Sequence, residues 1–310
     1  MAVTYTTNWA GDVVDNIYKV LGVGNQVVSK GAAYLETGVR DKRALPYMTL
    51  GASPVGAYEA TPTSETADTD YAERQLDMVK GMLYEVMNPV TWHDIWAPFA
   101  SQGMTVTNLQ MNPVVMDAVM SLYADKVGSQ FSSLFWNGDI SGSGDLINGI
   151  ITKAAADSNV VDVTNIGEIT ETNVFDVLQD VWDSVPDQFI DDPDYKIFMS
   201  TTDWRKAQSK NRSLKEDYAG SLDSSVRNLF LDKRIEHFSG IPENTIVAAK
   251  GTNGEDSNLI FGFYATPDAE LGAPRLDYVS NNSDNMFVRV NFKLDAQYRY
   301  GGEIVLYQGS

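Results

Sequence analysis

Residues 286–300 read MFVRVNFKLDAQYRY, and every even position in this stretch carries an apolar side chain. Six of the seven odd positions between them are polar. Such strict alternation is typical of a long strand with one buried face. Gly301-Gly302 then predicts a turn, and Ile304–Tyr307 predicts a short final strand.

The composition describes a folded, strongly acidic chain. It has 310 residues, of which 43% are hydrophobic, so one large domain or two modest ones can bury a core. The 42 acidic residues outnumber the 23 basic ones and give a net charge of -19. This charge disfavours a dedicated nucleic-acid reader and an anionic-membrane binder, because both need clustered lysine and arginine.

Several kinds of chemistry lack their residues. The chain has no cysteine, which excludes disulfides, thiolate metal sites and cysteine nucleophiles. Its two histidines, His93 and His237, are 144 positions apart and predict no shared metal site. The stretch 139–145 has the oxygen spacing of a calcium loop, but Ile150 stands where a bidentate Glu belongs, which favours a flexible Gly/Ser linker. We therefore expect no enzyme, no metal and no cofactor.

The N-terminal third predicts elements that need a partner. Residues 9–22 predict a short amphipathic helix that begins at Trp9 and has Val13 and Ile17 on its apolar stripe. Arg43–Leu50 predicts a strand, 52–70 is a polar stretch, and 76–86 predicts a second strand, which together make a long hairpin. A polar loop of that length inside a compact domain usually belongs to a binding surface or an interface.

The centre of the chain contains the clearest helix. Asn112-Pro113 supplies an N-cap residue followed by proline at the first helical position, and apolar side chains recur at helical spacing as far as Trp136. Asn137-Gly138-Asp139 ends it. Beyond it, 146–265 alternates short helices and strands, with Thr202 as the expected cap of a helix that bears Trp204.

Three stretches resemble the major capsid proteins of tailed bacteriophages, which have the Hong Kong 97-like fold that encapsulin shells also use. They are LFWNGD at 134–139 with LINGI at 146–150, SGIPENTIVA at 239–248, and the closing segment 288–306. The resemblance covers essentially the whole chain. It implies an α+β fold with an N-terminal arm, an extended β-hairpin loop, a peripheral domain with a long spine helix, and an axial α/β domain.

On that resemblance the arm is 1–40, the extended loop 41–88, the peripheral domain 89–145 with 266–310, and the axial domain 146–265. The implied function is self-assembly into the pentamers and hexamers of an icosahedral head that encloses double-stranded DNA without reading its sequence. Implied partners are further copies, a portal, a separate scaffolding protein and decoration proteins. The implied location is the virion, after assembly in the cytoplasm of a host bacterium, with no membrane role.

Expected contacts between subunits follow from elements that cannot bury their apolar faces alone. They are Trp9, Val13 and Ile17 in the arm, Met78, Met82 and Tyr84 in the loop region, and Lys42 and Arg43, which would pair with acids on a neighbour. Three alternatives stay open. They are an encapsulin-type nanocompartment shell, another phage structural part such as a tail or adhesin module, and an ordinary α/β enzyme.

Overall fold

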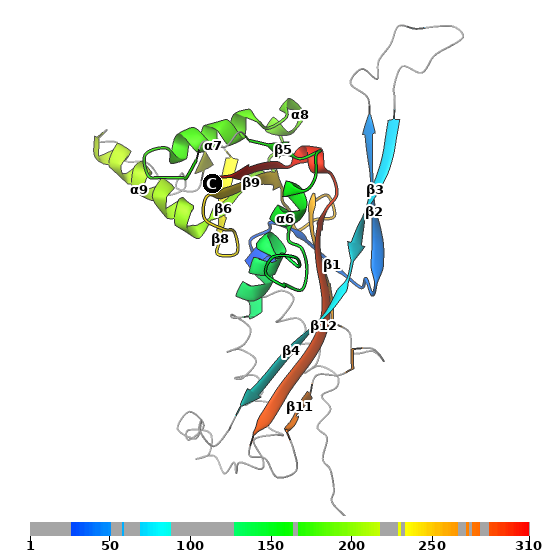
Figure 1. Cartoon of the computed structure of the whole chain (residues 1–310). Coiled ribbons are helices and arrows are strands. Elements are labelled where there is room, and N and C mark those ends of the chain that lie inside the picture. The colour runs from blue at the N-terminus through cyan, green and yellow to red at the C-terminus, as the bar shows by residue number, and fades with distance from the viewer. Residues whose placement is uncertain are drawn as a thin grey trace, which may run out of the picture.

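The computed structural model describes residues 26–50, 58, 69–87, 127–163, 167–217, 229–230, 233–265, 271–272, 275–279 and 285–309. Within these ranges the protein is a mixed α+β fold, as the sequence predicted, with two main sheets and a separate two-stranded hairpin. The hairpin projects from one side of the body, and helices gather around the other side (Figure 1).

The first sheet is built around the long strand β12 (Met286–Tyr298). On one edge, β12 pairs with β10 (Leu259–Tyr264) and with β11 (Arg275–Tyr278); on its other edge it pairs with β4 (Val79–Met87). β1 (Tyr34–Thr37) lies parallel to β10. All the described even-numbered side chains of β12 from Val288 to Tyr298 are buried, which confirms the predicted alternation.

The second sheet has six strands. In spatial order they are β5 (Val161–Asp162), β13 (Val305–Gln308), β9 (Thr245–Lys250), β6 (Tyr195–Ser200), β8 (Lys233–Phe238) and β7 (Leu229–Phe230). Its central strands are apolar on both faces because both faces are covered. In β9, for example, Ile246 and Ala248 lie in one hydrophobic cluster and Val247 and Ala249 in the other.

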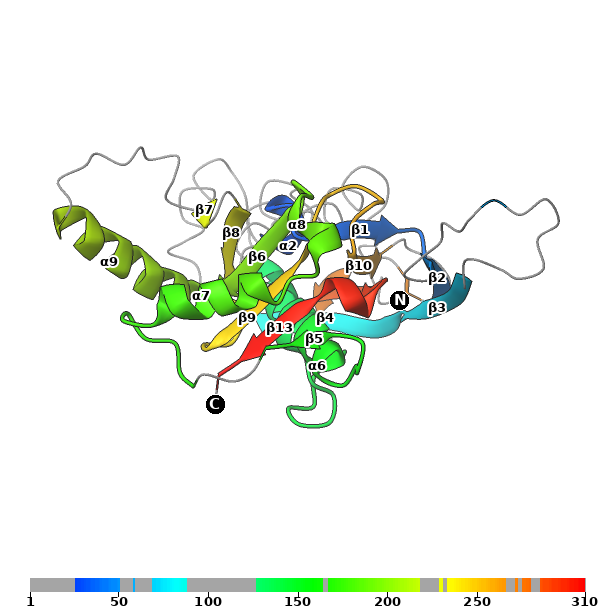
Figure 2. The ribbon, with the colours of Figure 1, turned by 90° about the horizontal axis from the view of Figure 1, so that it is seen from above.

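Helices cover these sheets (Figure 2). In chain order they are α2 (Gln26–Ser29), a helix of which 127–137 is described, α6 (Ile150–Ala155), α7 (Val174–Asp183), α8 (Asp187–Ile190), α9 (Thr201–Asp217) and the 3-10 turn η2 (Gly301–Glu303). α7 and the start of α9 pack on one face of the six-stranded sheet. Helix 127–137 and α6 pack into the core shared by the two sheets.

Aromatic contacts place helix 127–137 between the sheets. The Phe131 ring centroid lies 5.1 Å from that of Phe292 in the first sheet. One turn further on, Trp136 lies 5.2 Å from Phe198 and 5.4 Å from Phe238 in the second sheet. The apolar stripe that predicted this helix therefore makes two contacts: one part packs on the first sheet, and the next part packs on the second sheet.

Two glycines allow the chain to cross itself after this helix. Gly149 N–H donates a hydrogen bond of 2.8 Å to the carbonyl of Gly138. A Cβ atom on Gly149 would lie 2.6 Å from the carbonyl oxygen of Trp136, and one on Gly138 would overlap the carbonyl oxygen of Ile147. Any larger residue at either position would push the end of the helix away from α6.

The hairpin differs from the predicted one in its second strand. β2 (Lys42–Leu50) pairs antiparallel with β3 (Thr69–Asp77), from Lys42 opposite Asp77 to Leu50 opposite Thr69. The predicted strand over 76–86 is wrong, because the chain breaks at Met78 and β4 then joins β12 in the first sheet. Met82 and Tyr84 therefore belong to that sheet and not to the hairpin.

Two strands join sheets that their own sequence does not indicate. β10 belongs to the sheet of β12, and β13 pairs with β9 in the other sheet. The apolar pattern of a strand does not specify its sheet here, because both sheets line the same core.

Most of the remaining predicted elements are confirmed where the structure describes them. β6, α7, β8 and β9 confirm the alternation of short helices and strands expected over 146–265, and 127–137 confirms the end of the central helix. The expected cap was wrong: the Asp203 N–H donates to Ser200 Oγ at 3.0 Å, and Thr202 is exposed. The expected arm helix at 9–22, and the central helix before 127, lie outside the described residues.

The Gly/Ser stretch after this helix is a hydrogen-bonded turn and not a flexible linker. Asp139 Oδ1 accepts from the N–H groups of Ser141 and Gly142, each at 2.9 Å. Asp145 Oδ2 accepts from the N–H of Asp139 at 3.0 Å. These two carboxylates are thus used to close the turn.

Candidate assembly surface

The projecting hairpin exposes large apolar side chains. Met48 and Tyr71 stand directly opposite each other on β2 and β3, with 65% and 69% of their surfaces exposed. Nearer the body, Leu45 and Leu76 are buried against Ile260 of β10. The base of the hairpin is thus part of the core, while its outer part carries apolar surface with no cover from the described residues.

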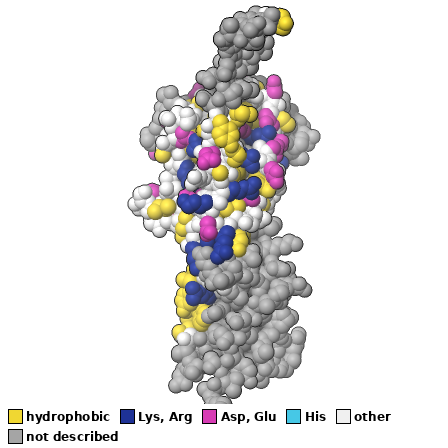
Figure 3. Space-filling view, turned by 90° about the vertical axis from the view of Figure 1, so that its right-hand side faces the viewer, with side chains coloured by type: hydrophobic (Ala, Val, Ile, Leu, Met, Phe, Trp, Pro, Cys, Tyr) yellow, Lys and Arg dark blue, Asp and Glu magenta, His cyan; other side chains and the backbone are white. Residues whose placement is uncertain are grey.

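A second apolar surface lies on β4. Met82, Tyr84 and Val86 are 53%, 48% and 44% exposed, and the Tyr84 ring lies 5.7 Å from that of Phe287 on β12. We call these four residues the β4 face. Apolar and basic side chains gather over this lower part of the molecule (Figure 3).

The β4 face points outward because of strand alternation. Gly81 and Leu83, one position out of phase, point toward helix 127–137 and the core. A Cβ atom on Gly81 would lie 2.6 Å from the ring of Phe292, so only glycine fits this inner position. With the inner face closed by the core, the alternate residues of β4 face outward.

Lys42 and Arg43 each have an acidic partner within their own chain. Lys42 Nζ lies 2.8 Å from Asp77 Oδ1, because the hairpin register places these two residues opposite each other. Arg43 forms an ion pair with the buried Glu36 of β1. Met78 is partly buried against the hydrophobic cluster at the hairpin base, so it is an anchor and not a free contact residue.

The hairpin base is tied to the odd-numbered face of β12. Asp41 Oδ1 lies 2.7 Å from the buried Lys293 Nζ. The N–H of Asp77 donates a hydrogen bond of 2.8 Å to Asp295 Oδ2. Burial raises the pKa of Asp295, and the ammonium of Lys153, 3.0 Å away, acts against that rise. Both polar side chains in the middle of β12 are therefore buried in pairs.

Arg74 of β3 adds a further link. Its guanidinium lies 4.3 Å from the centre of the Tyr298 ring and forms an ion pair with Asp157. Tyr298 also donates to Asp157 Oδ2 at 2.9 Å. Burial raises the pKa of Asp157, but hydrogen bonds from the Asn159 N–H, Tyr298 and Arg74 outweigh it, so the net pKa is lowered. These contacts fix the direction in which the hairpin leaves the body.

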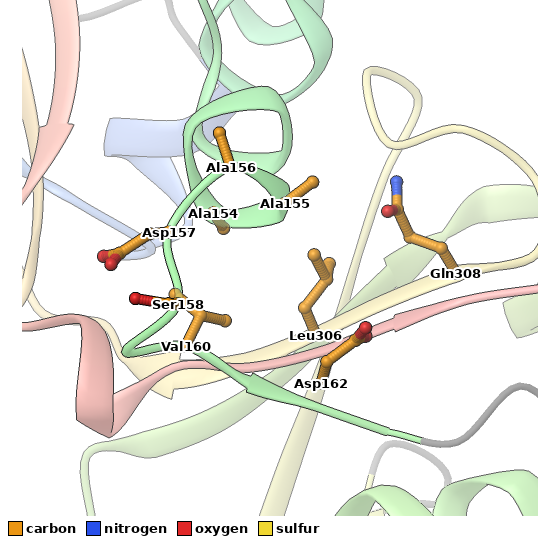
Figure 4. Close-up of a pocket in the computed structure, with 9 residues that line it drawn as sticks. All are labelled: Ala154, Ala155, Ala156, Asp157, Ser158, Val160, Asp162, Leu306 and Gln308. Atoms are coloured by element: carbon orange, nitrogen blue, oxygen red, sulfur yellow. The ribbon is translucent and has the colours of Figure 1, made fainter.

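A pocket of about 420 Å³ lies between the end of α6, β5 and β13 (Figure 4). Asp157 and Asp162 contribute its carboxylates, and the close-up shows their side chains pointing to different sides of the pocket. Because Asp157 is already held by Arg74 and Tyr298, this lining supplies no paired acid and base for catalysis.

The described ranges contain neither a metal-binding cluster nor a membrane-spanning helix. In these ranges no group of three or more His, Asp and Glu side chains is arranged to hold a metal ion. None of the helices there is both long and apolar enough to cross a membrane.

The expected contact residues are thus divided. Met82 and Tyr84 lie together on the β4 face, Lys42, Arg43 and Met78 serve the hairpin base, and Trp9, Val13 and Ile17 lie outside the described residues. Sequence reasoning missed Met48, Tyr71, Val86 and Phe287. The sequence signal for these residues was their position in the strand. An apolar residue an odd number of positions away from a buried one on the same strand must face the opposite, outward side.

Among the comparisons with known proteins, only the one with solved structures finds matches. No family model matches the sequence, and no curated protein matches it. Solved structures do: the chain aligns with the satellite phage P4 procapsid that includes the size determination protein Sid, with a TM-score of 0.62 and 10% identity over 98% of this chain and 92% of that one. It aligns with the capsid of the native GTA particle at a TM-score of 0.57 and 13% identity, over 100% and 94%.

A third match, Gordonia phage Cozz, has a TM-score of 0.55 and 10% identity over 92% of this chain and 87% of that one. At such identities the similarity lies in the arrangement of elements, and it extends from end to end in both chains. The chain therefore has the Hong Kong 97-like fold of tailed-phage capsid proteins.

Proposed function

We propose that this chain is a major capsid protein that assembles into the pentamers and hexamers of an icosahedral phage head around double-stranded DNA. The observation that carries the proposal is a capsid fold over the full chain length, matched to shell proteins over about nine-tenths or more of their own length. The work of such a protein is mechanical, and we assign it no catalytic residue and no cofactor.

The hairpin supports this function by its physics. A two-stranded hairpin is marginally stable by itself, and this one extends beyond the body with Met48 and Tyr71 uncovered by the described residues. Burying these side chains and the β4 face against a neighbour would contribute to the total buried surface of about 1,000 Å² or more that a specific contact needs. Contacts between unlike surfaces of identical subunits close into rings.

The proposal has further parts, which concern the arm, the regions of the fold, the partners and the location. Trp9, Val13 and Ile17 of the arm contact a neighbouring subunit, and the arm, extended loop, peripheral and axial regions take the roles expected from the sequence. A separate scaffolding protein, a portal and decoration proteins are the proposed partners. The assembled protein resides in the virion and is built in the host bacterial cytoplasm.

The test is assembly of the full chain, expressed alone and together with its scaffolding protein, followed by light scattering and negative-stain microscopy. We expect capsomer rings, tubes or closed shells. A monomer that persists under both conditions would overturn the proposal.

The contents of the shells separate a phage head from an encapsulin-type compartment. In particles isolated from infected cells, we expect double-stranded DNA that resists nuclease until the shell is opened by heat. Shells that hold a co-purifying enzyme and no nucleic acid would favour the compartment instead.

A further inference from the structure

α9 is an unusual helix for this protein. Between Trp204 and Lys215 it carries five basic residues and no acidic one, in a chain with a net charge of -19. Only Asp203 and Ala207, both in its first half, are buried among its described side chains. The rest of the helix extends away from the six-stranded sheet (Figures 1 and 2).

Three of these cations have no ion-pair partner in the described part of the chain. Arg205, Lys210 and Arg212 form no ion pair there, whereas Lys206 is held by Asp203 at 2.9 Å and Glu243 at 2.7 Å. Arg205 and Arg212 are exposed, and Lys210 is half-buried. Between Ser209 and Ser213 α9 buries no side chain, so this part gains little from the core of its own domain, and a contact outside the domain is expected to stabilise it.

The opposite charge lies on α7 and α8 of the same domain. Asp183, Asp187 and Asp191 are exposed at four-residue intervals and have no ion-pair partner among the described residues. α7 packs on both α9 and β13, and α9 also packs against β6 and β8. Although the two helices are in contact, none of these cations and carboxylates forms an ion pair with another within the described part of one copy.

We propose that the basic face of α9, formed by the exposed Arg205 and Arg212, which lie seven residues apart on one side of the helix, docks on the acidic α7–α8 surface of a second copy of this chain. Charge complementarity selects this occupant. A contact between unlike faces of identical subunits is the kind that closes into a ring. The inference rests on the proposed function and assigns one of its inter-subunit contacts.

Charge reversal tests this contact. Arg205→Glu with Arg212→Glu forms the first variant, and Asp183→Lys with Asp187→Lys and Asp191→Lys forms the second. Asp183 and Asp191 lie at helix C-termini, where lysine is favourable, so the second variant does not weaken its helices there. Circular dichroism and thermal unfolding verify that both fold.

Each variant alone is expected to need at least about tenfold more protein to form rings or shells, as measured by light scattering. Mixing the two in equal amounts should restore assembly to within about threefold of the unmodified protein, because every contact then joins opposite charges. Alternating rings need an even number of subunits, so six-membered rings should form and five-membered rings should not. Glu255→Lys, on an exposed turn far from both surfaces in the sequence, is the control and should change nothing.

Ionic strength gives an independent readout. Raising the salt concentration from about 0.05 M to 0.5 M should weaken assembly of the unmodified protein and of the mixture alike, because the charges become screened within a few ångströms. Normal assembly by either variant alone, or no rescue on mixing, would overturn the inference while the proposed function stands. Normal shells that lose only their DNA would assign the basic face to nucleic acid and also overturn it.

Discussion

Lys153 Nζ of α6 lies 3.0 Å from Asp295 Oδ1 in the middle of β12, and the same ammonium donates a hydrogen bond to the carbonyl of Ala296. Asp295 is 4% exposed, so its charge depends on this partner and on the N–H of Asp77. One buried pair thus joins a helix, the central strand and the base of the projecting hairpin.

Removing one partner of this pair should be costly. Lys153→Met leaves the carboxylate buried without its cation and should lower the free energy of unfolding by about 3 kcal/mol. The double variant Lys153→Met with Asp295→Leu should recover most of that loss, because no charge then stays buried. Urea unfolding of the single and double variants measures both effects; equal stability of the two would contradict the explanation.

Glu303 should make the stability fall as the pH rises through neutrality. Burial raises its pKa to about 7, an effect that the nearby Lys250 only partly offsets. In the unfolded chain the carboxyl has its ordinary pKa of 4.5. The folded state therefore binds the proton more tightly, and stability is lost between pH 4.5 and about 7.

The expected loss over that interval is on the order of 3 kcal/mol. Glu303→Gln should remove it, which chemical unfolding at pH 5, 6, 7 and 8 can measure. The exposed Glu255→Gln is the control and should leave the slope as it is. An unchanged slope in Glu303→Gln would show that the buried carboxyl is not the source.

Gly138 and Gly149 should tolerate no larger side chain. Gly149→Ala would place a Cβ atom 2.6 Å from the backbone carbonyl of Trp136, and backbone atoms at the helix end cannot move aside cheaply. We expect a loss of several kcal/mol or failure to fold. Gly144→Ala is the control, because its new Cβ atom would meet no atom within 4 Å. Only the strain of an alanine at a φ of +71° should lower the free energy of unfolding there, by about 1 kcal/mol. Thermal unfolding compares them.

The β4 face should matter for assembly and not for folding. Met82→Ser with Tyr84→Ser changes side chains that are about half exposed, so the thermal midpoint should move by no more than a few degrees. Assembly into rings or shells should fall by tenfold or more, as measured by light scattering. Leu83→Ser, on the inner side of the same strand, should instead destabilise the monomer.

The sequence was most informative about features that depend on a single strand or helix and not on its neighbours. The alternation from Met286 to Tyr298 predicted a strand and its buried face correctly, because a period of two is a property of the strand alone. The end of helix 127–137 was equally clear from Asn137-Gly138-Asp139. The cap at Ser200 was missed because Thr202 is an equally good N-cap residue by type.

The candidate surface was predicted less well. Met82 and Tyr84 were predicted as contact residues, but their strand was given to the hairpin, since apolar residues alternate over 76–86 with Lys80 as the one interruption. The pairing of β2 with β3 places Lys42 beside Asp77, and Arg43 meets Glu36 of β1; the pattern of a single strand specifies neither contact.

The sequence by itself determined the acidic charge, the lack of thiol chemistry, most strands and helices, and the resemblance to a capsid fold, because these depend on composition and on local periodicity. Only the tertiary structure decided which sheet each strand joins, that β13 returns beside β9, and that Asp295 meets Lys153. Those relations join segments that are far apart in the chain, such as Val305 with Ala248 and Asp295 with Lys153. The pattern of one segment specifies its buried face but not the identity of its neighbour.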